Sequence, residues 1–107
     1  MPGFELIGKE EYKEIQDLFE NSGILFRHGF DAMRNDIYKV RDFEKKFSKK
    51  LGVADSLAVS SGTAALKVAL EAIGVGKGDE VITQAFTFVA TVESIVEVGA
   101  KPVIANI

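Results

Sequence analysis

The chain of 107 residues has no cysteine and a single histidine, His28. Without cysteine it can form neither a disulfide framework nor a thiol nucleophile, and one histidine cannot build a metal cluster by itself. Basic residues are also not in excess, because 13 Lys and Arg stand against 16 Asp and Glu. The net charge of −3 argues against a nucleic-acid partner, since phosphates attract basic surfaces.

Long apolar runs are missing as well. The opening "MPGFELIGKEEYKE" lacks the basic region and apolar core of a secretory signal, and no apolar stretch approaches the span of a bilayer. We therefore expect a cytoplasmic protein with no membrane partner. What is present, 47% hydrophobic and 27% charged residues, is typical of a folded chain, and the length allows one domain at most.

The first half of the sequence has a helical pattern. Apolar residues at spacings of three and four predict two amphipathic helices, over 9–21 and from Val40 to Leu51, joined by an ordered loop. Gly52 is a typical stop for the second helix. Residues 1–55 are therefore interpreted as a helical lead-in.

Two side chains of the connecting loop are candidates for a site. His28 is interpreted as a solvated loop residue, with substrate contact as the alternative. Arg34 is expected to form a salt bridge to Asp31 or Asp36, and the alternative is bidentate binding of a substrate carboxylate.

Over residues 56–107, short apolar segments typical of strands alternate with segments that have a helical pattern. The pattern predicts a strand, a helix, a strand, a helix and a strand, over 56–60, 62–74, 80–83, 88–99 and 101–107. Apolar strands separated by helices indicate an α/β fold with a parallel sheet covered on both faces. No helix follows the last predicted strand to cover it, and the predicted helix over 62–74 is apolar on nearly all sides. Both features need further protein to bury them, so we expect this chain to be the N-terminal part of a larger protein.

The junction "AVSSGTAAL" between the first strand and its helix has two interpretations. A helix start presents free N–H groups and a partial positive charge, and a glycine there admits a close ligand, so the junction can bind an anion. Alternatively, Ser61 or Thr63 simply caps the helix. The segment has neither the glycine spacing of a dinucleotide-binding loop nor the lysine of a P-loop.

The longer succession "LAVSSGTAALKVALEAIGVGKGDEVIT" and "FTFVATVESIVEVGAKPVIANI" resembles the DegT/StrS-type aminotransferases, which aminate keto sugars with pyridoxal 5'-phosphate. The resemblance runs from about Val40 to the end. It implies the N-terminal part of the large domain of a fold-type I enzyme, a parallel-type sheet with flanking helices. The stretches "MPGFELIG" and "FDAMRNDIYKVRDFE" resemble a narrower branch, the transaminases that make 8-amino-3,8-dideoxy-octulosonate for lipopolysaccharide.

The resemblance implies which residues bind the cofactor. Gly62, Thr63 and Ala64 are placed at the phosphate, and Phe88 is placed against the pyridine ring, where a core phenylalanine is the alternative. The family usually has a proline at Gln84–Ala85, and this chain has none. Offset stacking of the Phe88 ring on the pyridine ring would contribute roughly 1 kcal/mol of binding free energy beyond that of burial.

The resemblance also implies what this stretch lacks. The lysine that binds the cofactor covalently and the acidic partner of its ring nitrogen lie downstream in the family, so we predict no catalytic residue, no metal site and no transamination by these 107 residues alone. The implied partners are a keto sugar, an amino donor such as glutamate, and a second subunit in a homodimer. A stand-alone phosphate- or nucleotide-binding module and an interaction fragment without catalysis are the alternatives.

Overall fold

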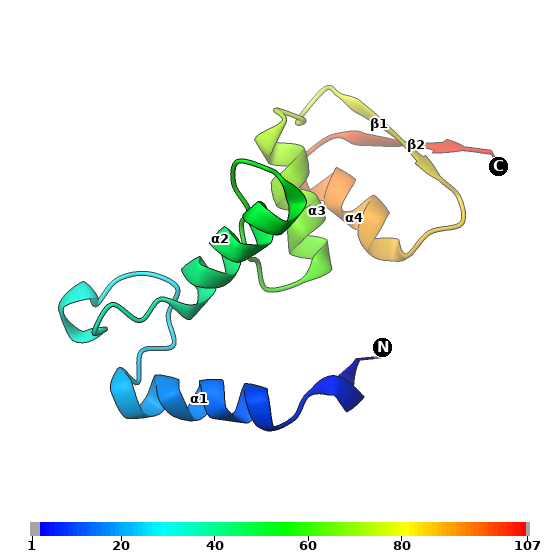
Figure 1. Cartoon of the computed structure of the whole chain (residues 1–107). Coiled ribbons are helices and arrows are strands. Elements are labelled where there is room, and N and C mark those ends of the chain that lie inside the picture. The colour runs from blue at the N-terminus through cyan, green and yellow to red at the C-terminus, as the bar shows by residue number, and fades with distance from the viewer. Residues whose placement is uncertain (1–2, 107) are drawn as a thin grey trace. The chain divides into compact units, whose positions relative to one another are not determined.

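The computed structural model describes residues 3–106, and the chain forms two compact units that divide between Ala58 and Val59 (Figure 1). The first unit holds helices α1, Lys9–Asn21, and α2, Lys39–Leu51. Its short 3-10 turns are η1, Phe4–Leu6, and η2, Asp31–Met33. Both predicted helices are confirmed, with α2 starting one residue earlier. No helix of the described residues is long and apolar enough to cross a bilayer.

Helices α1 and α2 are joined by ion pairs rather than by a large apolar contact. Lys39, the first residue of α2, places Nζ 2.6 Å from a Glu14 oxygen and 2.8 Å from an Asp17 oxygen on α1. These two carboxylates raise the pKa of Lys39. Such exposed pairs orient helices but contribute little free energy.

The loop between α1 and α2 is organised by Arg34, whose side chain is buried. Arg34 Nε donates to the Gly29 carbonyl at 2.5 Å, and its Nη2 donates to the Phe26 carbonyl and, at 3.2 Å, to that of His28. The salt bridge expected with Asp31 or Asp36 is therefore wrong. A buried guanidinium has five donors, and the loop folds back to offer three carbonyls, which accept hydrogen bonds from Nε and Nη2.

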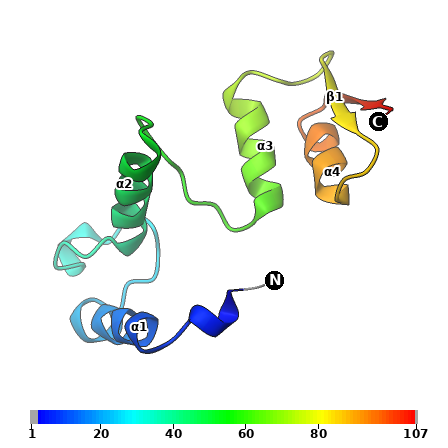
Figure 2. The same cartoon turned by 45° about the vertical axis from the view of Figure 1, so that its right-hand side comes forward.

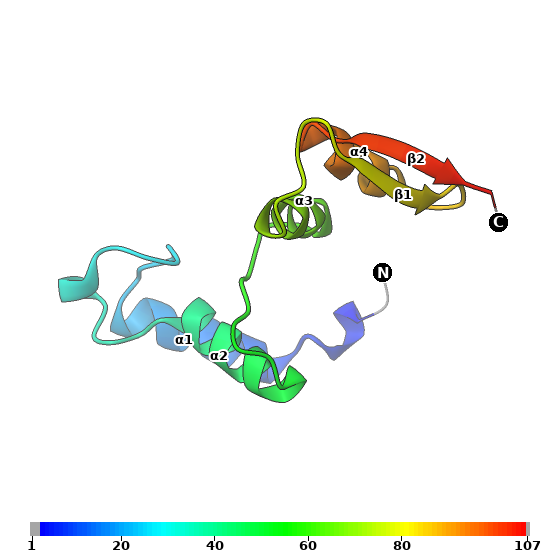
Figure 3. The same ribbon diagram turned by 90° about the horizontal axis from the view of Figure 1, so that it is seen from above.

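The second unit contains α3, Gly62–Ala72, β1, Glu80–Gln84, α4, Val89–Glu97, and β2, Lys101–Ala105. Strands β1 and β2 are parallel neighbours, with Glu80 paired to Lys101 and Gln84 to Ala105 (Figure 3). Helix α4 connects the strands and packs on both, and α3 packs against α4 (Figure 2). The predicted α/β organisation is thus confirmed as a β-α-β unit with one added helix.

The core of this second unit lies under α4. Ala90 and Ile95 on α4 are buried, together with Ala100 just before β2. Along β1 the half-buried Val81 alternates with exposed residues, and Ile82 is 74% exposed. Within residues 3–106, helices therefore cover one face of the sheet and not the two that the sequence predicts.

The predicted strand over 56–60 is not formed. These residues belong to no strand, because no segment of the described chain lies beside them to complete a ladder of hydrogen bonds. An apolar strand sequence specifies a strand only where a neighbour accepts and donates those bonds. The strands predicted at 80–83 and 101–107 form over Glu80–Gln84 and Lys101–Ala105, since each is the other's partner. The last predicted residue, Ile107, lies outside the described residues.

Candidate functional site

The start of α3 is built by Ser61. Its backbone is extended, with φ −158° and ψ 164°, and its hydroxyl accepts a hydrogen bond from the Ala64 N–H at 3.1 Å. The Ser61 carbonyl accepts from the Ala65 N–H at 3.0 Å. The helix cap foreseen at Ser61 is therefore confirmed, and it uses the amides of the third and fourth helical residues.

Two amides of the same helix start are left over. Within residues 3–106, the N–H groups of Gly62 and Thr63 donate to no acceptor. The first turn also contains no acidic residue that would compete for them. Free amides at the positive end of a helix attract anions, so the cap and the anion site are compatible in the same turn.

Gly62 is not required by the local fold. Its φ lies outside the left-handed region, and a Cβ built on it would meet no atom within 4 Å. A glycine that neither the backbone nor the packing needs still lets an outside group approach the chain closely. Gly62 therefore leaves open space next to two amides that have no acceptor within residues 3–106.

The other predicted residues lie at the starts of the same two helices. Thr63 and Ala64 are half-buried in the first turn of α3. Phe88 directly precedes α4 and is 76% exposed, so it is not a core residue of this unit. The views in Figures 1 and 2 show α3 and α4 running in the same direction, which brings their N-terminal ends to one end of the unit.

That end also follows the carboxyl end of β1, since only four residues separate Gln84 from α4. Open α/β sheets bind ligands outside the carboxyl ends of their strands. The fold therefore places the candidate residues on α3 and before α4 where a ligand is expected. No group of three potential metal ligands occurs in the part of the chain that the structure describes.

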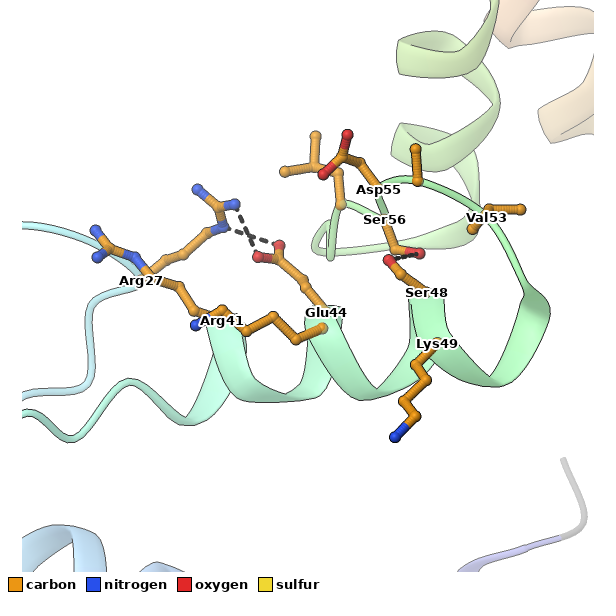
Figure 4. Close-up of a pocket in the computed structure, with 11 residues that line it drawn as sticks. Arg27, Arg41, Glu44, Ser48, Lys49, Val53, Asp55 and Ser56 are labelled. Atoms are coloured by element: carbon orange, nitrogen blue, oxygen red, sulfur yellow. Dashed lines mark hydrogen bonds and ion pairs between the residues drawn. The ribbon is translucent and has the colours of Figure 1, made fainter.

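A second feature, which sequence reasoning missed, lies in the first unit. A groove of about 810 Å³, here named the α2 groove, runs between α2 and the segment after it (Figure 4). At its floor Glu44 is buried and accepts two hydrogen bonds from Arg27, from Nε at 3.0 Å and from Nη2 at 2.9 Å. Further lining residues include Arg41, Lys45, Ser48, Lys49 and Asp55.

Glu44 also binds the backbone of the following segment. The Ala58 N–H donates to Glu44 Oε1 at 2.8 Å, and Ser48, one turn along α2, donates to the Ser56 hydroxyl at 2.8 Å. Arg27, and after it the Ala58 N–H, hold the pKa of the Glu44 carboxyl below its ordinary value. A sequence signal was available: Glu44 and Ser48, four residues apart, lie on one side of the apolar stripe of α2.

The comparisons with known proteins agree with this α/β architecture. Residues 14–107 match the DegT/DnrJ/EryC1/StrS aminotransferase family. The spore coat polysaccharide biosynthesis protein SpsC of Bacillus subtilis is 45% identical over 102 residues, which cover 95% of this chain and 24% of that protein. The UDP-2-acetamido-2-deoxy-3-oxo-D-glucuronate aminotransferase of Pseudomonas aeruginosa is 36% identical over 101 residues, covering 92% and 27%.

A solved structure gives the same result. Spr1654 from Streptococcus pneumoniae, in its PLP-form, is 31% identical and superposes with a TM-score of 0.75 over 92% of this chain and 23% of its own. The chain thus spans about a quarter of the length of these proteins. It belongs to the DegT/DnrJ/EryC1/StrS aminotransferase family.

Proposed function

We propose that the protein containing this chain is a pyridoxal-phosphate-dependent aminotransferase that transfers an amino group to a keto sugar. The observation that carries the proposal is the start of α3, where the amides of Gly62 and Thr63 have no acceptor in the described part of the chain and Gly62 leaves open space. Family membership supports the reaction class, and the P. aeruginosa relative is named for an oxo sugar.

Each residue of the proposed cofactor site has its own task. Gly62 and Thr63 donate backbone N–H groups to the phosphate, and the Thr63 hydroxyl is a further donor. Ala64 already donates its N–H to Ser61, so it contributes a small side chain beside the phosphate. The exposed ring of Phe88 stacks on the pyridine ring. The bound cofactor supplies an electron sink for amino transfer.

The chain's contribution to this reaction is binding and orientation. None of its lysines lies in a motif that matches the family's cofactor lysine, so we propose that the covalent attachment and the proton transfers belong to residues outside this sequence. By this proposal the 107 residues alone do not transaminate.

The narrower parts of the proposal concern substrate, partner and compartment. Glutamate is the proposed amino donor, and an octulosonate destined for lipopolysaccharide is the proposed sugar, on the resemblance of the two N-terminal stretches alone. We further propose a cytoplasmic homodimer. The exposed apolar residues Ile73 and Ile82 of the second unit, at 76% and 74% exposure, favour burial against further protein.

The test of the cofactor site is Gly62→Ala in the whole protein. The new methyl meets nothing in the chain, and alanine favours a helix over glycine by up to about 1 kcal/mol, so stability should be kept or raised. The affinity for pyridoxal 5'-phosphate, measured by absorbance titration, should fall by about tenfold, because the methyl occupies the space of the phosphate.

Gly76→Ala is the matched control. A Cβ there would lie 3.7 Å from the Val98 carbonyl oxygen, an ordinary contact in the same unit but away from the start of α3. It should leave cofactor affinity unchanged. If Gly62→Ala also leaves the cofactor affinity unchanged, the phosphate does not bind at this turn.

A further inference from the structure

The residue at the N-cap of α4 is a phenylalanine, Phe88, whose side chain makes no capping hydrogen bond. Helices prefer serine, threonine, aspartate or asparagine at this position, because a side-chain oxygen there accepts a free N–H of the first turn. The ring of Phe88 is also 76% exposed, so within residues 3–106 it neither caps the helix nor packs into a core. The position thus serves the ring and not the helix start.

The backbone on both sides of Phe88 is held by one residue, Thr91, in the first turn of α4. The Thr91 N–H donates to the Phe88 carbonyl at 3.0 Å. The Thr91 hydroxyl lies 2.9 Å from the hydroxyl of Thr87, the residue before Phe88, and either oxygen can donate the hydrogen bond. A contact between the first turn and the residue that precedes the cap fixes the direction in which the chain enters a helix.

We propose that Thr91, through its hydroxyl bond to Thr87, is a positioning residue that orients the Phe88 ring for stacking on the pyridine ring. The inference rests on the proposed function. The backbone angles of a residue decide which side-chain rotamers it can adopt, so fixing the chain around Phe88 narrows the directions of its ring. Stacking is favourable only in certain offsets and angles, and a ring that is oriented before binding loses less conformational freedom. All three residues lie in the second unit, Val59–Ile107.

The test is Thr91→Val in the whole protein. Valine keeps the branched shape and the N–H that bonds the Phe88 carbonyl, and it removes only the hydroxyl. The affinity for pyridoxal 5'-phosphate, measured by absorbance titration, should fall by about threefold. The circular dichroism that the bound cofactor acquires from its asymmetric surroundings should weaken too, because the stacked ring is less well oriented. Thr91→Ser retains a hydroxyl and should keep both signals.

Two controls isolate the effect of the hydroxyl. Thr83→Val makes the same chemical change on β1, at a half-buried residue whose hydroxyl has no hydrogen-bond partner among the described residues, and should change neither signal. In a Phe88→Ala background, Thr91→Val should cause no further loss of affinity, because no ring is left to orient.

The outcomes separate this inference from the proposed function. If Thr91→Val lowers the affinity equally with and without the Phe88 ring, or lowers only the melting temperature, the hydroxyl does not act through Phe88 and the inference is overturned. If Thr91→Val does not fold, Thr87→Val removes the same hydrogen bond and is judged by the same results. If Phe88→Ala itself leaves the affinity unchanged, the proposed stacking is wrong, and the positioning role falls with it.

Discussion

Two helix starts in this chain, those of α1 and α3, treat their free amides in opposite ways. The first turn of α1 carries Glu10 and Glu11, and the Glu11 carboxylate accepts the Gly8 N–H at 2.7 Å. The first turn of α3 carries no acid, and its cap is the neutral hydroxyl of Ser61. The start of α1 thus has its own negative charge, whereas the positive end of α3 has none in its first turn.

The largest expected effect comes from making α3 resemble α1. Thr63→Asp in the whole protein places a carboxylate in the first turn of α3, where it favours the helix but repels a phosphate. We expect the cofactor absorbance to be lost, an affinity decrease of about a hundredfold or more, with folding intact. Thr63→Ala removes only a hydroxyl and should weaken binding by a smaller factor. Equal cofactor content in Thr63→Asp and the unmodified protein, at matched folding, would contradict the assignment.

How far local sequence predicts structure depends on where the partners of a segment lie. The end of α2 was predictable because Gly52 takes a φ of 70°, which other residues rarely adopt, whereas α3 ends at Ala72, two residues before the predicted end. The strand over 56–60 was not, since pairing depends on a neighbour that the segment itself does not specify. Arg34 was misassigned for a related reason: the nearby Asp31 and Asp36 were visible in the sequence, but the carbonyls that fold back onto it were not.

In the candidate site, too, the features set by local sequence were predictable and those that depend on distant partners were not. A serine cap followed by a glycine is a local pattern, and the structure confirms the cap at Ser61. That the amides of Gly62 and Thr63 remain free could not be read from the residues, because an acceptor from elsewhere in the chain could have filled them. Glu44 was missed because a polar residue beside an apolar stripe has many explanations, and its partner Arg27 lies 17 residues away.

An intermediate effect is expected at Phe88, the residue at the start of α4. Because its ring is 76% exposed, Phe88→Ala should change the stability of this unit little. It should lower cofactor affinity in the whole protein by about fivefold, the equivalent of a stacking interaction of roughly 1 kcal/mol. Phe88→Tyr should retain binding. Phe86→Ala, which removes a ring that is 86% exposed two residues earlier, serves as the control.

The Phe88 result has a clear alternative. If Phe88→Ala binds the cofactor normally and only lowers the melting temperature, the ring packs against other protein and the site is limited to the start of α3. Loss of affinity in Phe86→Ala to the same extent would indicate that the segment as a whole, and not the stacked ring, matters.

The smallest expected effect is the pH response that distinguishes the two helix starts. The Gly8 N–H, and after it the amide of Glu11 itself, hold the pKa of the Glu11 carboxyl below its ordinary value. A carboxyl whose pKa is lower in the folded than in the unfolded chain stabilises the fold above the unfolded value, about 4.3, and loses that contribution as the pH falls through the folded pKa. The cap of α3 has no titratable group, so acid should weaken the start of α1 and leave that of α3 unchanged.

In selectively labelled protein, the Gly8 amide resonance should move on acidification below about pH 4 while that of Ala64 stays, and Glu11→Gln should abolish the Gly8 shift. A common midpoint for the Gly8 and Ala64 amides would show global acid unfolding instead, and the difference between the two caps would have no electrostatic consequence.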